Sequence, residues 1–354
     1  MLTSHHVALV KLAFTTDNVE AALPVLEKDV VFYPTTKQSH EPRPLCGADL
    51  TPAAYITIHN GFSQPLSSTD VLQYDLLRGL CFIQRRAWQH ALDALERVVT
   101  YPARETQSCS KIMVDAYNKW LLVGLLQNGK APTLPPTTVP GAQKAYSTLS
   151  KSYLGLAKAF EEGTANALRA EFENLGPVFF NEENNLGLVR LVLQHYQRWQ
   201  ILNLRRVFSK ISLEQIRTRT KSAETGAPLT SVEDVEKLVA EMIGEGMLQG
   251  VIERPAEGAA GEPYLSFHEA AAGGAGGLLS EAEFAARMAA TAQRLKALEP
   301  LVGATNERLG ANKEYVRYVA EKQKKEKEGK REYELSFLNQ VEDEDLMTGV
   351  VPGY

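Results

Sequence analysis

The feature that most constrains the fold is a helical period of apolar residues, which runs through almost every segment up to residue 245. Several of these segments come in pairs joined by short turns. Such pairs are expected at residues 5–14 with 18–30, and at residues 145–161 with 165–175. Helix pairs of this kind bury their apolar faces only against neighbouring pairs. The period therefore predicts a mainly α protein whose first part is a helical-repeat solenoid.

Residues 72–102 form the clearest pair. Gly79 and Phe82 are followed by Ala91, then by large apolar residues, and Pro102 closes the unit. This order resembles the tetratricopeptide repeat, in which small residues allow two helices to pack closely. We interpret Trp88 in the same unit as a core residue rather than as part of a ligand site.

Two stretches interrupt the helical pattern. Residues 31–68 are rich in Pro, Ser and Thr, and residues 131–141 contain four prolines, so both are predicted to be irregular connections. A further helix is expected between them, from Ile112 to Leu126.

The next part of the chain predicts three more helices. The longest spans residues 186–208 and can be capped by Asn184 or Asn185. Two shorter helices begin at Ser212 and Ser231, each followed three residues later by a side chain suited to a capping box.

After residue 246 the period changes to that of strands. Residues 247–252 and 264–267 are short apolar runs around a loop of Pro, Gly and Glu, which predicts a β-hairpin. Three helices followed by a hairpin is the order of a winged helix, whose hairpin is the wing. In DNA-binding versions the last helix enters the major groove, but residues 232–245 carry five acids and one basic residue, Lys237. Because these acids would repel phosphates, protein assembly is favoured over DNA binding.

The wing also indicates how a partner can bind. An outer strand offers unpaired backbone groups, to which a neighbouring chain can add its own strand. The alternative is a hairpin that only closes the core. The candidate partner-binding residues of the wing are Met247, Leu248, Val251, Ile252, Tyr264, Leu265 and Phe267.

A basic stretch precedes the acidic helix, with seven basic residues and one acid, Glu214, in residues 198–221. Three interpretations are open: a solvated or acid-pairing helix face, a nucleic-acid contact, or a contact with an acidic protein partner. The candidate acidic-partner patch consists of Arg205, Arg206, Lys210, Arg217 and Arg219.

The C-terminal part predicts a linker, a long helix and a tail. Residues 270–279 are mainly Ala and Gly, which is typical of a flexible linker. The following helix has a narrow apolar seam, suited to helices of partner chains or to docking on its own solenoid. Pro300 is expected to kink this helix or to end it near Leu298. The candidate partner-binding residues of the seam are Met288, Leu295, Leu298, Val302 and Leu309.

Composition adds mainly exclusions. The chain of 354 residues has 44% hydrophobic and 23% charged residues and a net charge of -5, which is typical of a globular protein without a global basic field. Cys46, Cys81 and Cys109 form no CxxC pair, and the sequence has no secretory signal and no run of 18 apolar residues. An intracellular protein without a membrane span is expected. No phosphate-loop, nucleophile-elbow or zinc-binding motif is present, so no catalytic, cofactor-binding or metal-binding residue is predicted.

The run from residue 184 to residue 220, which begins NNLGLVRLVLQ, resembles the PCI-domain family, as do the SLEQ helix start and the SFH at the end of the wing. The stretches ALPVLEKDV near residue 22 and RLKAL at residues 294–298 match in the same order. Members of the family occur in the proteasome lid, the COP-nine signalosome and translation initiation factor three, and the signalosome members are the most similar. The family has further repeats ahead of the position of Leu2.

The resemblance implies a helical-repeat arm joined to a PCI winged-helix module whose helical part starts near residue 145. The expected parts are the arm at residues 1–183, the winged-helix module at 184–269, the linker at 270–279, a C-terminal bundle helix at 280–330 and an acidic, disordered tail at 331–354.

The resemblance further implies a non-catalytic scaffold subunit of the signalosome, which supports removal of a ubiquitin-like modifier from cullin-RING ubiquitin ligases. Winged helices would pair edge to edge with other PCI subunits, and C-terminal helices of partner subunits would form a bundle. Neither a cofactor nor a nucleic acid is expected, and the location would be cytoplasmic and nuclear. The alternatives are a PCI subunit of the proteasome lid or of initiation factor three, or an RNA- or DNA-linked PCI protein that uses residues 198–221.

Overall fold

The computed structural model describes residues 1–30, 32, 56, 61–102, 109–254, 262–267, 281–311, 313 and 315–324. The chain divides into two units, Met1–Gly277 and Leu278–Tyr354, and each is described by itself. The expected linker at 270–279 and tail at 331–354 lie outside the described residues, as does most of the expected connection at 31–68.

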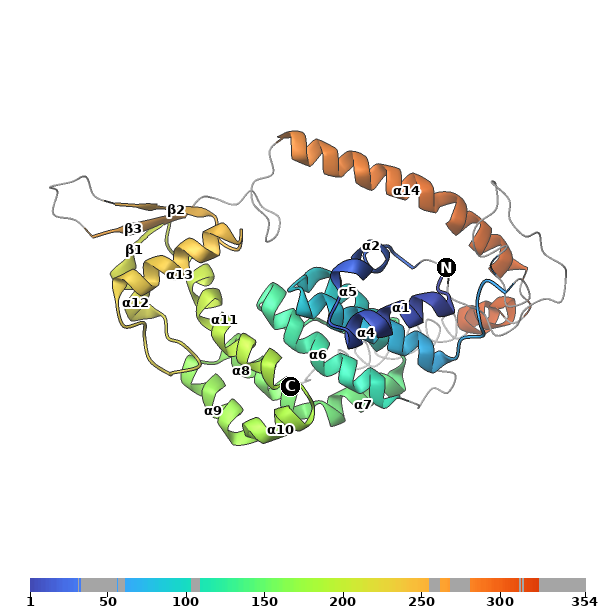
Figure 1. Ribbon diagram of the computed structural model, residues 1–354, viewed down its shortest axis with the longest axis horizontal. Coiled ribbons are helices and arrows are strands. Elements are labelled where there is room, and N and C mark those ends of the chain that lie inside the picture. Colours follow the sequence, from blue (N-terminus) through green and yellow to red (C-terminus); the bar gives the residue numbers. More distant parts are fainter. Residues whose placement is uncertain are drawn as a thin grey trace, which may run out of the picture. The chain divides into compact units, whose positions relative to one another are not determined.

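The first unit begins with helices that follow one another side by side, as the period predicted (Figure 1). Together they form the helical-repeat arm. In chain order they are α1 (Ser4–Thr15), the 3-10 helix η1 (Glu20–Ala22), α2 (Leu23–Leu26), α4 (Ser68–Gln84), α5 (Trp88–Val99), α6 (Lys111–Asn128), α7 (Pro140–Leu149), α8 (Lys151–Glu162), α9 (Ala165–Leu175) and α10 (Pro177–Glu182).

The pair α4 and α5 packs as the sequence indicated. A Cβ atom at Gly79 would lie 3.0 Å from Cγ and Cδ2 of Leu95, so only glycine allows this approach without a shift. Ala91 is fully buried beside it, and Trp88 packs partly buried against the core. Ser67 caps α4 in a reciprocal capping box with Asp70.

Two expected helices of the arm are wrong in their bounds. Residues 18–30 were expected to form one helix, but the structure has η1 and the four-residue α2 there. Residues 145–161 were expected to be a single helix, but the structure has α7 and α8, which meet at Ser150. Pro140 starts α7, where a proline is favourable because its missing N–H has no helical partner anyway. Thr164 caps α9 and accepts a hydrogen bond from the backbone N–H of Ala167 at 3.3 Å.

The long helix expected at 186–208 is α11 (Leu186–Leu204). Asn185 occupies its N-cap position, but its side chain makes no capping bond and instead donates from Nδ2 to the Tyr153 hydroxyl at 2.7 Å. Tyr153 in turn donates to Glu183 at 2.6 Å. The asparagine therefore ties α11 to α8 rather than capping it.

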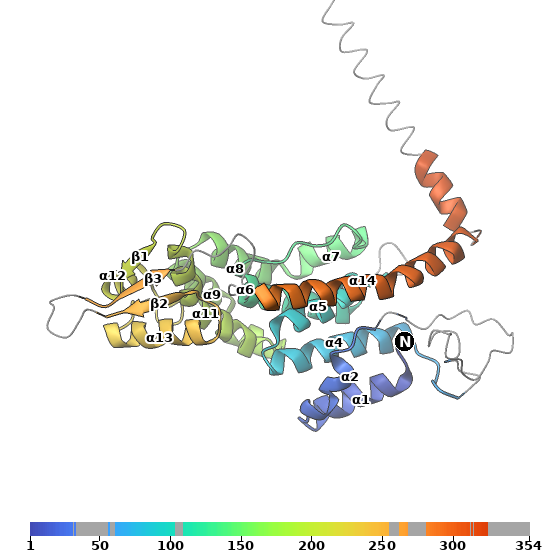
Figure 2. The same cartoon turned by 90° about the horizontal axis from the view of Figure 1, so that it is seen from above.

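The winged helix follows, with α12 (Leu213–Arg219), α13 (Val232–Gly244), and the strands β2 (Gly250–Glu253) and β3 (Tyr264–Phe267). Ser212 and Ser231 cap the two helices as expected. The sequence did not predict a third strand, β1 (Lys210–Ser212), which pairs antiparallel with β3. The sheet order is β1-β3-β2, so the second strand of the hairpin is central (Figure 2).

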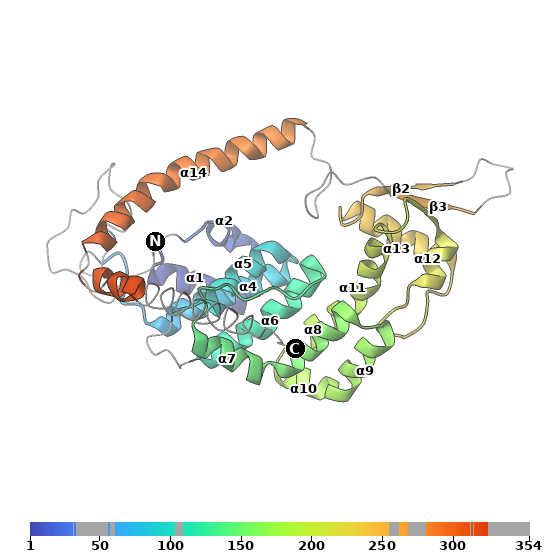
Figure 3. The same cartoon turned by 180° about the vertical axis from the view of Figure 1, so that it is seen from behind.

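Two apolar cores fill the first unit. The larger one runs from Leu2 to Tyr196 through the arm and also includes Ala223. The smaller one belongs to the winged helix and includes Ile201, Ile216, Val239 and Leu265. Because α11 contributes to both, it connects the arm to the winged helix without a break (Figure 3).

The second unit contains α14 (Glu281–Gly310), and residues 315–324 are also helical. Pro300 lies inside α14. Of the two expected outcomes, an end near Leu298 is therefore wrong, and a kink at Pro300 stays a prediction. Proline deprives the preceding turn of one hydrogen bond, but the helix continues beyond it.

Candidate functional site

The wing residues proposed from the sequence fall into three groups. Leu248, Leu265 and Phe267 are buried in the core of the winged helix itself, so their side chains do not form a surface. Met247, Ile252 and Tyr264 are half-buried. Only Val251 is exposed, at 50%. Of the candidate partner-binding residues of the wing, only Val251 on β2 therefore offers an exposed side chain.

The two edges of the sheet differ in how well they can accept another strand. β1 has three residues, starts with the exposed Lys210 and runs directly into α12. Short length and an edge lysine are features that oppose strand addition. Among the described residues no strand pairs with the outer side of β2. β2 is therefore the edge more open to a partner.

A polar cluster holds the three strands together near the end of the hairpin. The Tyr264 hydroxyl donates to Glu253 Oε2 at 2.5 Å, and Lys210 Nζ lies 3.4 Å from Glu253 Oε1. The same ammonium group lies 5.1 Å from the centre of the Tyr264 ring. The hydrogen bond from Tyr264, helped by the charge of Lys210, lowers the pKa of Glu253. The cluster fixes the register of all three strands.

The basic stretch is partly neutralised within the chain. Arg198, with a side chain 15% exposed, bridges Glu241 at 3.1 Å and Glu245 at 2.5 Å on α13. Arg217 pairs with Glu214 at 2.6 Å, and Lys210 pairs with Glu253. These pairs agree with the interpretation of an acid-pairing face.

Three arginines of the candidate acidic-partner patch have no acid partner within the described part of the chain: Arg205, Arg206 and Arg219. The Arg219 guanidinium lies 5.0 Å from the centre of the Phe208 ring, which places it at the turn that follows Arg205 and Arg206. Both α11 and α12 end in this region, and cations are favourable at helix C-termini. The helix dipoles therefore account for part of this arrangement.

The seam of α14 exposes large apolar side chains. Met288, Leu295 and Val302 are 60%, 65% and 57% exposed within the described residues. Leu298 and Leu309 are half-buried. The first three lie seven residues apart, so they share one face of the helix.

Sequence reasoning missed a groove in the arm, which we call the arm groove. It has a volume of about 860 Å³ and is lined by the end of α1, by α4, by the first half of α6, and by the turn from α10 to α11. Its apolar residues Leu76, Leu80 and Ile112 have the helical spacing of core residues, so the sequence offered no signal to separate them from the core.

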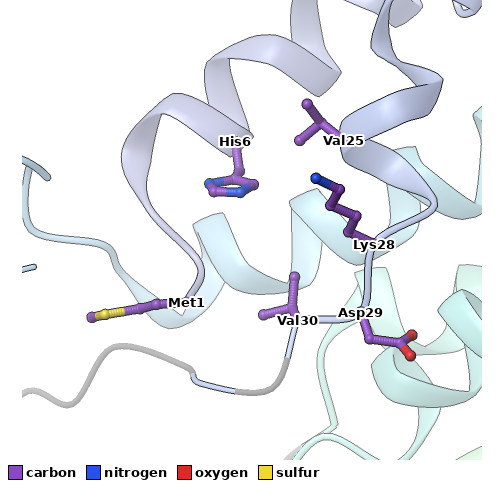
Figure 4. A pocket seen from close by; sticks show the side chains of 6 residues that line it. All are labelled: Met1, His6, Val25, Lys28, Asp29 and Val30. Carbon is purple, nitrogen blue, oxygen red and sulfur yellow. The ribbon is translucent and has the colours of Figure 1, made fainter. Parts of the chain in front are cut away.

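A smaller pocket of about 310 Å³ lies at the start of α1 (Figure 4). Its histidine, His6, accepts a hydrogen bond from the backbone N–H of Thr3 at 3.3 Å, and the two side chains are 2.7 Å apart. Burial lowers the pKa of His6. The imidazole thus serves a helix cap. The lining residues are Met1, His6, Val25, Lys28, Asp29 and Val30.

Within the described ranges, no three His, Cys, Asp or Glu side chains are placed to hold a metal ion. No helix in the same ranges is long and apolar enough to cross a bilayer.

The family model and the similar proteins all carry the same subunit name. Residues 1–140 match the family model described as COP9 signalosome complex subunit 3, N-terminal helical repeats. A Neurospora crassa protein of the same subunit name is 48% identical over 358 residues, which cover 99% of this chain and 70% of that protein. The Emericella nidulans protein is 33% identical over 244 residues, or 69% of this chain and 48% of that protein.

The similarity extends beyond fungi. The Arabidopsis thaliana protein named COP9 signalosome complex subunit 3 is 28% identical over 184 residues, which cover 52% of this chain and 40% of that protein. The chain thus spans less than half the length of the Emericella and Arabidopsis relatives. With a helical-repeat arm, a winged helix and 48% identity to the Neurospora protein over 99% of its own length, the chain belongs to the family of COP9 signalosome complex subunit 3.

Proposed function

We propose that this chain is a non-catalytic scaffold subunit of the COP9 signalosome, which supports deneddylation of cullin-RING ubiquitin ligases. The observation that carries the proposal is the β2 edge of the winged helix. Within the described residues, no strand pairs with the outer side of β2, and its Val251 is 50% exposed. A strand edge of this kind gives affinity through main-chain hydrogen bonds.

The sequence supports the non-catalytic role. It contains no set of nucleophile, base and orienting group that forms a known catalytic motif. The chain would then contribute positions for other subunits rather than chemistry.

The C-terminal helix supplies a second contact in this proposal. The exposed seam residues Met288, Leu295 and Val302 would pack against C-terminal helices of partner PCI subunits. The subunit would act in the cytoplasm and the nucleus, where the complex would meet its ligase substrates.

The wing edge is tested by Val251→Lys, with Val251→Thr as a matched control. Lysine at an edge opposes strand addition, whereas threonine keeps the β-branched shape. We expect Val251→Lys to lower incorporation into the co-expressed complex at least tenfold in native mass spectrometry, and Val251→Thr to keep it. Because Val251 is half exposed, neither change should alter the melting temperature. Full incorporation of Val251→Lys would exclude β2 as the contact.

The family assignment favours the signalosome over the proteasome lid and initiation factor three. A role on nucleic acid is less well supported, since Arg198, Lys210 and Arg217 are paired with acids. Contact with an acidic partner remains a proposal for Arg205, Arg206 and Arg219. It predicts that their replacement by Glu weakens a protein contact, whereas a steep salt dependence of RNA binding would favour nucleic acid instead.

A further inference from the structure

The arm groove lies between successive first helices of the helix pairs. α1 packs beside α4, α4 packs beside α6, and the groove opens along this row. Rows of repeated helices form extended surfaces that bind other polypeptides. The volume of the groove, about 860 Å³, lies at the upper end of the range for small-ligand pockets. The groove can therefore hold a peptide segment.

One part of the groove is apolar. Leu76 and Leu80 come from α4, one turn apart, and Ile112 and Val114 face them from α6. All four are half-buried. Phe14 at the end of α1 is 42% exposed and adds an aromatic ring. A large apolar side chain of a partner can pack against these side chains.

The charged side chains that line the groove are two lysines and three acids, so together they carry a net charge of -1: Lys111, Lys119, Asp115, Glu182 and Glu183. Lys119 and Asp115 pair with each other. Glu182 and Glu183, at the end of α10, form no ion pair within the described residues. Glu183 accepts hydrogen bonds from Tyr153 at 2.6 Å and from Asn118 Nδ2 at 3.5 Å, which fixes its position. A Lys or Arg of the partner would therefore be favoured at this end.

Asn118 adds an independent indication of a ligand. The residue is 4% exposed and lines the groove, and its Oδ1 atom has no hydrogen-bond partner in the described structure. Buried acceptors without a partner are rare because desolvation is costly. A donor that enters the groove can satisfy Asn118 Oδ1, because the hydrogen bond from Nδ2 to Glu183 sets the orientation of the amide.

We propose that the arm groove binds an extended segment of a partner polypeptide, in which a large apolar residue stands beside Lys or Arg. The apolar side chain packs on Leu76, Leu80 and Phe14, and the cation meets Glu182 and Glu183. Donors of the segment reach Asn118. This contact lies on the arm and is independent of the wing edge. The result of the Val251 test therefore neither supports nor contradicts it.

Fluorescence anisotropy of the full chain with two labelled probe peptides tests the proposal. The basic probe is Gly-Ser-Leu-Arg-Phe-Lys-Leu-Ser-Gly, and the acidic probe carries Glu in place of Arg and Lys. We expect the basic probe to bind at least tenfold more tightly. Equal affinity of the two probes would overturn the proposal.

Matched variants locate the binding. Glu182→Lys is compared with Glu162→Lys, an equally exposed glutamate at the end of α8, and Phe14→Ser with Leu149→Ser, which is 65% exposed outside the groove. We expect Glu182→Lys to abolish the preference for the basic probe and Phe14→Ser to weaken both probes about tenfold, with the two control variants unchanged. Losses of the same size in the controls would show non-specific attraction and overturn the proposal.

Light scattering of the wild-type and variant proteins tests whether a second copy of the chain occupies the groove instead. A wild-type dimer that Phe14→Ser converts to a monomer would assign the groove to a second copy of the chain and overturn the proposal. Unchanged mass in both proteins, together with the expected peptide preference, would support it.

Discussion

Gly79 is a residue at which two helices of the arm, α4 and α5, pack closely. Its missing side chain leaves room for Leu95, which is fully buried on the facing helix. Gly187 in α11 provides a contrast, since a Cβ atom there would meet nothing within 4 Å. The two glycines occupy similar secondary structure but differ in packing, so substitution should have opposite effects on stability.

We predict that Gly79→Ala lowers the free energy of unfolding by about 1 kcal/mol, because overpacking outweighs the gain in helix propensity. Gly187→Ala should raise it by roughly 0.5 kcal/mol, since only propensity changes. Urea denaturation of both variants measures the difference. A Gly79→Ala protein as stable as wild type would show that Leu95 can move aside without cost.

Single residues were predictable where their chemistry is local. Ser212, Ser231 and Thr164 cap helices because a hydroxyl accepts the bond of a backbone N–H within three residues. Asn185 was not predictable, because Tyr153 competes for its side chain from 32 residues away. The acceptor without a partner at Asn118 also depends on packing that no local pattern records.

At the scale of elements, α14 is the helix whose apolar face has the least cover. Its exposed seam repeats every seven residues, and Pro300 removes one backbone hydrogen bond from its middle. A seam of this width is too narrow to stabilise an isolated helix, so partner helices are the natural cover in the proposed bundle.

We predict that Leu295→Asp removes this chain from its contacts with the C-terminal helices of other subunits. The aspartate would place a charge in the apolar seam. Because Leu295 is exposed in the free chain, the charge should destabilise only the contact with partner helices and not the free protein. Gln293→Asp, on the opposite face of the same helix, serves as the control. Native mass spectrometry of the co-expressed complex should show subcomplexes only for Leu295→Asp, and intact complexes for both variants would contradict the bundle.

Elements with a long apolar period were predictable, and short ones were not. α4, α5, α6 and α11 follow the period over three turns or more. β1 has only three residues, and its pairing with β3 depends on a chain segment more than 50 residues away. The break between α7 and α8 occurs at Ser150, without the proline or glycine that usually marks one.

At the scale of the first unit, α11 is the element that joins the two cores. Val192 and Leu193 lie in the core of the arm, whereas Ile201 lies in that of the winged helix. His195 sits between these positions and hydrogen-bonds to the Leu191 carbonyl at 2.9 Å. Burial, as the largest cause, lowers the pKa of His195, and the charges of Arg198 and Arg86 act in the same direction against that of Glu245.

The pH dependence of stability follows from this shift. With a folded-state pKa below the unfolded value of about 6.5, His195 binds a proton more readily in the unfolded chain. Its contribution is present above the unfolded pKa and is lost as the pH falls toward the folded value. We predict that the melting temperature falls between pH 7 and pH 5, and that His195→Gln makes this fall shallower. An unaltered slope in His195→Gln would refute the assignment.

The shared helix α11 also limits how such chains can exchange parts in evolution. A recombination break at residue 184 keeps α11 whole but separates Val189 and Val192 from the arm partners with which they are packed. A break after α11 instead takes Ile201 away from the winged helix. We expect a viable chimera between two relatives to inherit arm, α11 and wing from one parent, so that the three change together along a lineage.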